Sequence, residues 1–140
     1  MIFAKRFVFD TSTLLGAVLR PASVPRQAFR AALSQGVLCA SPATLAELER
    51  VLMRDKFDAY QIRATRLEFL QDYRDVLRLF PVTEADALGL PQPCRDPQDD
   101  KFLALARHCE ADIIVSSDGD LLVLNPWQGV PILTPAQFLG

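Results

Sequence analysis

Histidine, lysine and cysteine are scarce in this chain of 140 residues, which contains one histidine, three lysines and three cysteines. The cysteines at positions 39, 94 and 109 are odd in number and form no C-x-x-C pair, which argues against a disulfide framework or a zinc site. Free thiols fit a reducing compartment, so we expect a cytoplasmic protein. No apolar run approaches the roughly 18 residues that cross a bilayer, so no membrane partner is expected.

The bulk composition indicates one compact domain over residues 1–140. Half of the residues are hydrophobic and the net charge is −2, so the chain is able to bury a continuous core. Twelve arginines against three lysines would suit phosphate recognition, because the guanidinium group offers a planar fork of donors. Surface solvation and the arginine bias of a GC-rich genome explain the same excess at least as well.

Short apolar segments alternate with helical patterns along the chain. Segment 2–10 is too short and too interrupted by charge for a secretory signal, and it is predicted to be the first strand. Ser41 followed by Pro42 is typical of a helix start. The other predicted strands cover 37–40, 80–82, 112–116 and 130–133, and the other predicted helices cover 12–19, 26–35, 60–77 and 99–109, with a last helical turn near 135.

This alternation predicts an α/β fold of three α/β/α layers, with a central, mainly parallel twisted sheet. Ligands of such sheets bind outside the carboxyl ends of the strands. Asp10 follows the first predicted strand and Asp118 follows the apolar run IIV, so both fall on that edge. The remaining candidate acids lie in helical patterns or beside a glycine, and they are Glu47, Asp96, Asp99, Asp100 and Asp120.

Each of these acids has an ordinary structural explanation when it is taken alone. Aspartates cap helices and favour their first turn, glutamates cover helix surfaces, and an Asp-Gly-Asp sequence is a common turn. Together they recur in the order expected for one edge of a sheet, where clustered carboxylates repel unless a cation joins them. Carboxylates without histidine or cysteine partners favour Mg²⁺ or Mn²⁺, ions that activate water and clamp phosphoryl oxygens.

Five segments of the chain carry a resemblance to a known family, and their order and spacing are more specific than any one of them. They are VFDTSTLL, AELERVLMRDKF, CRDPQDDKFLALA, ADIIVSSDGDLL and VPILTPAQFL. With these segments the chain resembles the PIN domain, and within it the VapC-like toxin components of toxin–antitoxin systems. The resemblance implies a metal-dependent endoribonuclease that hydrolyses RNA phosphodiester bonds, with a small antitoxin protein as partner and a homodimer as its assembly.

The resemblance also assigns the site residue by residue. It implies Asp10, Glu47, Asp99 and Asp118 as catalytic metal ligands, with Asp96 and Asp120 as further ligands. Within the third segment the choice between Asp96, Asp99 and Asp100 stays open, with Asp99 preferred for its spacing to Phe102. Ser12 and Ser116 stand where the family often has Asn and Thr, and these two serines and Asp100 are expected to support the ligands.

The RNA contacts are less strongly indicated. Arg95 and Lys101 flank the third acidic segment and are the candidates for phosphate contacts. Arginines 63, 66, 74 and 78 form a stripe on the predicted helix 60–77, which would suit RNA or an acidic antitoxin segment, although a solvated helix surface explains it better. The alternative function is a catalytically silent PIN-fold module that binds RNA or protein. A haloacid-dehalogenase-like phosphatase is disfavoured, because it needs an acid at position 12.

Overall fold

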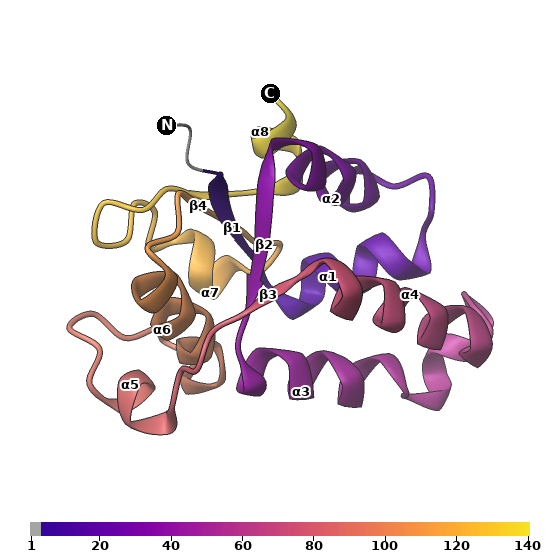
Figure 1. Ribbon diagram of the computed structural model, residues 1–140, viewed down its shortest axis with the longest axis horizontal. Coiled ribbons are helices and arrows are strands. Elements are labelled where there is room, and N and C mark those ends of the chain that lie inside the picture. Colours follow the sequence, from indigo (N-terminus) through magenta and orange to yellow (C-terminus); the bar gives the residue numbers. More distant parts are fainter. Residues whose placement is uncertain (1–3) are drawn as a thin grey trace.

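A five-stranded parallel sheet forms the centre of the protein in a computed structural model that describes residues 4–140 (Figure 1). All four strand pairs are parallel, in the order β3-β2-β1-β4-β5. This arrangement confirms the predicted α/β fold with a mainly parallel sheet. The strands are β1 (Lys5–Phe9), β2 (Gly36–Ala40), β3 (Arg78–Leu79), β4 (Ile113–Val115) and β5 (Ile132–Leu133).

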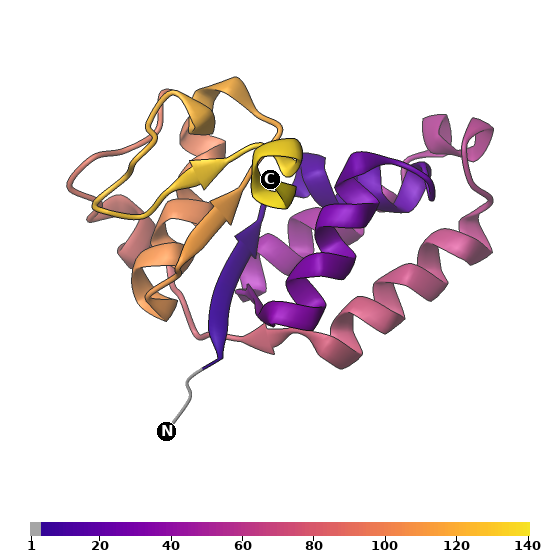
Figure 2. The same ribbon diagram turned by 90° about the horizontal axis from the view of Figure 1, so that it is seen from above.

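Helices connect the strands and cover both faces of the sheet (Figures 1 and 2). The helices on one side are α1 (Thr11–Leu19), α2 (Val24–Gln35), α3 (Pro42–Leu52), α4 (Arg63–Val76) and α8 (Pro135–Leu139). Those on the other side are α5 (Glu84–Leu88), α6 (Asp100–Cys109) and α7 (Gly119–Leu122). Two short 3₁₀ helices, η1 (Asp55–Ala59) and η2 (Pro97–Asp99), precede α4 and α6.

The alternation of side chains along the strands divides the hydrophobic core in two. In β1, Phe7 and Phe9 pack with α1, α2 and α8, whereas Val8 packs with α6. The neighbouring β4 repeats the pattern, with Ile114 in the α6 core and Val115 in the other. Because successive residues of a strand face opposite sides, a sheet covered on both faces needs such continuous apolar runs.

Local signals explain most helix boundaries. The Ser41 side chain accepts a hydrogen bond from the Thr44 N–H, and the Thr44 hydroxyl accepts one from the Ser41 N–H, which forms a capping box at the start of α3. Ser23 caps α2 in a similar way, so this helix begins at Val24, two residues before the predicted start.

Two expectations from the sequence need correction, and a third falls partly outside the described residues. The third strand lies at 78–79 and not at 80–82, because Arg78 and Leu79 pair with the end of β2. The sequence did not predict α5, a single short helix that a Thr83 capping box starts. The predicted first strand began at residue 2, and its first two residues lie outside the described part of the chain.

Arg66 also differs from its predicted place on an exposed stripe. Its side chain is 1% exposed and is enclosed between α4, η1 and the end of α3. The guanidinium donates to the backbone carbonyls of Gln61, Leu52 and Arg54 and forms an ion pair with Asp58. Arg66 is therefore a structural group.

No helix within residues 4–140 is long and apolar enough to cross a membrane.

Candidate metal centre

Asp10 lies directly after β1, at the carboxyl end of the central strand. Its N–H donates to the Val115 carbonyl at 3.1 Å, so β4 fixes its backbone. The carboxylate is 2% exposed and caps α1 by accepting from the Thr13 N–H at 2.9 Å. Its other oxygen accepts from the Ser116 hydroxyl at 2.5 Å. Burial raises the pKa of Asp10, although these hydrogen bonds oppose the shift.

Asp118 lies three residues beyond β4 and reaches the same edge of the sheet. Its carboxylate caps the short α7 by accepting from the Asp120 N–H at 2.9 Å. The Ser116 hydroxyl, which donates to Asp10, also accepts from the Asp118 N–H at 2.9 Å. Ser116 is fully buried and therefore sets the position of both aspartates relative to each other. The Ser12 hydroxyl gives Asp10 a further contact at 3.2 Å.

Glu47 reaches the cavity from α3. One of its oxygens accepts from the Thr11 hydroxyl at 2.5 Å, and the other forms an ion pair with Lys101 of α6. Glu47 and Lys101 are largely shielded from solvent, with 14% and 18% of their side chains exposed. Two helices from opposite faces of the sheet are thus joined by one ion pair at its carboxyl edge.

Asp99 ends η2, immediately before α6, and completes the group. One carboxylate oxygen, Oδ2, is buried and has no hydrogen-bond partner within residues 4–140. Burial and the neighbouring Asp118 carboxylate raise the pKa of Asp99 to about 8. A buried acceptor without a donor is costly in a folded protein, so its persistence points to a ligand that satisfies it.

These four carboxylates surround one cavity of about 220 Å³. Asp99 is therefore the member of the third acidic segment that faces the other three acids, which the sequence alone left open. The walls consist of Asp10, Thr11, Ser12, Leu15, Glu47, Val51, Asp99, Phe102 and Asp118.

The other predicted ligands lie outside this wall. Asp96, Asp99 and Asp120 each bring one carboxylate oxygen within 4.8 Å of the others, so Asp99 belongs to both groups of acids. Asp120 forms an ion pair of 2.9 Å with Arg95, whose side chain is 68% exposed. Asp100 instead supports the loop before η2, because it accepts from the Cys94 N–H at 2.7 Å.

Sequence reasoning missed the contributions of Thr11 and Thr13. Thr11 holds Glu47, and the buried Thr13 contacts Ser117 through its hydroxyl at 3.0 Å in addition to its hydrogen bond to Asp10. Both lie in the DTST segment, where small hydroxyl residues follow a strand-end acid. Their partners are 36 and 104 residues away, so only the fold shows what the hydroxyls contact.

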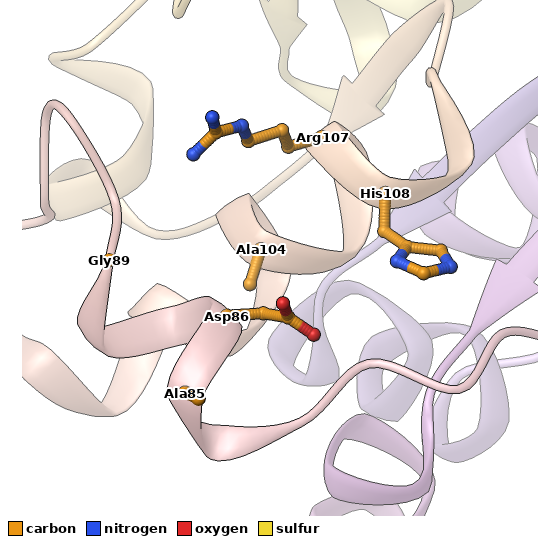
Figure 3. Close-up of a pocket in the computed structure, with 6 residues that line it drawn as sticks. All are labelled: Ala85, Asp86, Gly89, Ala104, Arg107 and His108. Carbon is orange, nitrogen blue, oxygen red and sulfur yellow. The ribbon is translucent and has the colours of Figure 1, made fainter.

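A second cavity lies between α5 and α6, away from the four carboxylates (Figure 3). Asp86 points from α5 toward α6 on the side of His108, and Arg107 points away from it. Asp86 accepts from the Thr83 N–H at 2.8 Å in the capping box of α5, which gives it a structural role. We assign no chemistry to this cavity.

The residues of the carboxylate cavity fit a hard divalent cation. Every charged side chain in its wall is a carboxylate, and one buried oxygen of Asp99 has no partner among residues 4–140. The hydroxyls of Ser12 and Ser116 are close enough to hold the ligands in place. Oxygen-only donor sets of this kind favour Mg²⁺ or Mn²⁺ over softer metals. Burial and then the neighbouring carboxylates raise the pKa of Asp99, and a cation would offset both.

Comparisons with known proteins identify the family of the chain and agree with its fold. A family model described as PIN domain matches residues 6–120. No curated protein matches the chain. Solved structures that share the fold include VapC20 of Mycobacterium tuberculosis, described as a sarcin–ricin loop cleaving toxin, with a TM-score of 0.59 and 14% identity over 89% of this chain and 98% of that one. PAE2754 of Pyrobaculum aerophilum has a TM-score of 0.60 and 14% identity over 96% and 88% of the two chains. VapBC2 of Rickettsia felis, bound to a DNA fragment from its promoter, has a TM-score of 0.60 and 12% identity over 91% and 96%.

Proposed function

We propose a nuclease function for this chain, which belongs to the PIN domain family. The proposed activity is metal-dependent endonucleolytic hydrolysis of RNA phosphodiester bonds, with Mg²⁺ or Mn²⁺ as cofactor and with all 140 residues forming one nuclease domain. The observation that carries the proposal is the buried Asp99 oxygen, which has no partner within residues 4–140, in the cavity where three other carboxylates converge. A structural cluster of acids would have satisfied that oxygen with a donor.

The proposed ligands are Asp10, Glu47, Asp99 and Asp118, with Asp96 and Asp120 in outer positions. A bound cation would supply a Lewis acid for the phosphodiester and an activated water as nucleophile. Ser116 and the Thr13 N–H hold the Asp10 carboxylate in one orientation, so little reorganisation is needed when a ligand arrives. Asp99, with its pKa of about 8, releases a proton when it becomes a ligand.

The rim of the cavity supports RNA as the substrate. Arg95 is mostly exposed beside Asp120, where its guanidinium is free to contact a phosphate as well as its carboxylate partner. Lys101 is the second proposed RNA contact, although its ammonium group pairs with Glu47 in the structure.

We further propose that the protein is the toxin of a type II toxin–antitoxin pair in the cytoplasm. Two of the structural neighbours are named as a toxin and as a VapBC protein with promoter DNA, which supports a small antitoxin protein as partner. The three free cysteines are buried and unpaired with each other, which suits a reducing compartment. A homodimer is the proposed assembly.

The experiment is RNA cleavage by the purified protein with Mn²⁺ or Mg²⁺ and with a chelator. We expect cleavage only with the cation, and a loss of roughly 100-fold or more in Asp10→Asn and Asp118→Asn, since each removes a charged ligand. Asp75→Asn, on the exposed surface of α4, is the matched control and should cleave at the parental rate. Circular dichroism checks that all variants are folded.

Two outcomes of the same assay would contradict the proposal. Parental cleavage rates in both ligand variants would show that the metal site is wrongly assigned. RNA binding without any cleavage, at every cation concentration, would favour a catalytically silent PIN-fold module.

A further inference from the structure

Glu47 differs from the three aspartates of the cavity because, within residues 4–140, it alone of the four forms an ion pair with a cationic side chain. Thr11 donates to Oε1 at 2.5 Å, and Lys101 is paired with Oε2. Asp99, by contrast, keeps one buried oxygen without a partner within residues 4–140. A divalent ion at Glu47 would therefore have to share or displace a partner, whereas at Asp99 it would supply the missing one.

The position of Lys101 is fixed by the fold. It lies in the first turn of α6, between Asp100 and the buried Phe102, and its ammonium group lies 6.0 Å from the centre of the Phe102 ring. Only 18% of the side chain is exposed, so water screens its charge poorly. The pair joins α6 to α3 across the edge of the sheet, which keeps the ammonium group beside the cavity.

A lysine at this place must influence any divalent cation nearby. The four carboxylates carry a formal charge of −4 when all are ionised, and Lys101 reduces it to −3. The ammonium group also repels a divalent ion directly, because like charges in a partly buried site interact strongly. Both effects act in the same direction and weaken cation binding.

We propose that Lys101 is an internal counter-ion that competes with the divalent cation for Glu47, an inference that rests on the proposed metal centre. This competition sets the affinity of the centre for the cation. Lys101 is a positioning residue in this scheme, since it acts through Glu47. In the protein without a divalent cation, the same ion pair neutralises the Glu47 carboxylate and holds α3 and α6 together.

The test is calorimetric titration of the purified protein with Mn²⁺. Lys101→Met should bind Mn²⁺ at least about tenfold more tightly than the parent, a modest figure for removing one unit charge beside a divalent ion at an effective dielectric constant of about 20. Lys101→Arg keeps the charge and should stay within about threefold of the parent. Lys101→Gln is a second neutral variant, for use if the methionine variant folds poorly. Its amide can still donate a hydrogen bond to Glu47.

Arg95→Met is the matched control. It also removes a cation paired with an acid of the same rim, but the Arg95–Asp120 pair is exposed to solvent. Its Mn²⁺ affinity should change by less than about threefold. Unchanged or weaker Mn²⁺ binding in both neutral Lys101 variants would overturn the proposal, because a lysine that merely positions Glu47 as a ligand predicts weaker binding.

Failure of this inference and failure of the nuclease proposal give different results. If the parent cleaves RNA with the metal and Lys101→Met has the same Mn²⁺ affinity as the parent, only the counter-ion role is contradicted. Tighter Mn²⁺ binding in Lys101→Met without RNA cleavage by the parent supports the counter-ion role and removes the nuclease function. A parent that binds no Mn²⁺ overturns both.

Discussion

Arg66 and Asp99 are both ionisable side chains with buried polar atoms, yet the surroundings of these atoms differ completely. The guanidinium of Arg66 donates to three backbone carbonyls and pairs with Asp58, so each of its nitrogens has a partner. Asp99 lies among other carboxylates, with one buried oxygen unpartnered within residues 4–140 and with its pKa raised to about 8.

This difference separates a structural charge from a functional one. A buried charge is tolerated when hydrogen bonds replace the water it lost, and Arg66 meets that condition. Asp99 meets it only when a cation or a proton arrives. Burial alone therefore does not identify a site, whereas an unsatisfied buried group beside like charges does.

The largest effect on stability is expected when the contacts of the Arg66 guanidinium are removed. Arg66→Met leaves three backbone carbonyls without their donor, and we expect a loss of about 3 kcal/mol in the free energy of unfolding. Arg63→Met, at an exposed position one turn earlier on α4, should change the free energy by less than about 0.5 kcal/mol. Urea unfolding measures both, and equal stability of the two variants would contradict the structural role of Arg66.

The next effect concerns the cation. Mn²⁺ at 100 times its dissociation constant should stabilise the parent by about 2.7 kcal/mol, because it binds the folded state. Asp99→Asn and Asp10→Asn should lose most of this gain, while Arg66→Met should keep it. Thermal unfolding with Mn²⁺ and with a chelator gives these differences. Equal Mn²⁺ stabilisation in the aspartate variants would place the cation elsewhere.

A smaller effect is expected from pH, because Asp99 is only half-buried and solvent screens its charge. The folded pKa of Asp99, about 8, exceeds the value of about 4 for an unfolded chain, so this group favours the fold at low pH. Its contribution is lost as the pH rises from about 4 to about 8. In a chelator, Asp99→Asn should therefore gain in Tm relative to the parent between pH 5 and pH 8. A difference that stays constant with pH would show that Asp99 has an ordinary pKa in the folded protein.

The smallest effect is predicted for a surface pair. Arg74 of α4 pairs with Glu49 of α3, and both side chains are more than one third exposed. Arg74→Ala should cost about 0.5 kcal/mol or less in the free energy of unfolding. A cost near that of Arg66→Met would mean that exposure does not distinguish the two arginines.

The sequence predicted more of the fold than of the site. Strand ends, the Ser41 cap and the alternation of strands with helices depend on residues within three or four positions of each other, and the structure has them within a few residues of the prediction. The third strand lies two residues earlier than predicted because Arg78 and Leu79 pair with the end of β2, and local sequence does not show this pairing. Arg66 was placed on an exposed stripe because helical periodicity does not show that η1 folds over it.

By itself, the sequence determined that Asp10 and Asp118 lie at the carboxyl edge of the sheet, since Asp10 follows the first apolar strand directly and Asp118 lies three residues beyond another. Only the tertiary structure decided that Asp99, and not Asp96 or Asp100, faces the cavity, and that Lys101 contacts Glu47. The direction of these side chains depends on how Phe102 and the rest of α6 pack against the sheet. A contact between residues 54 positions apart follows from that packing, and local sequence does not encode it.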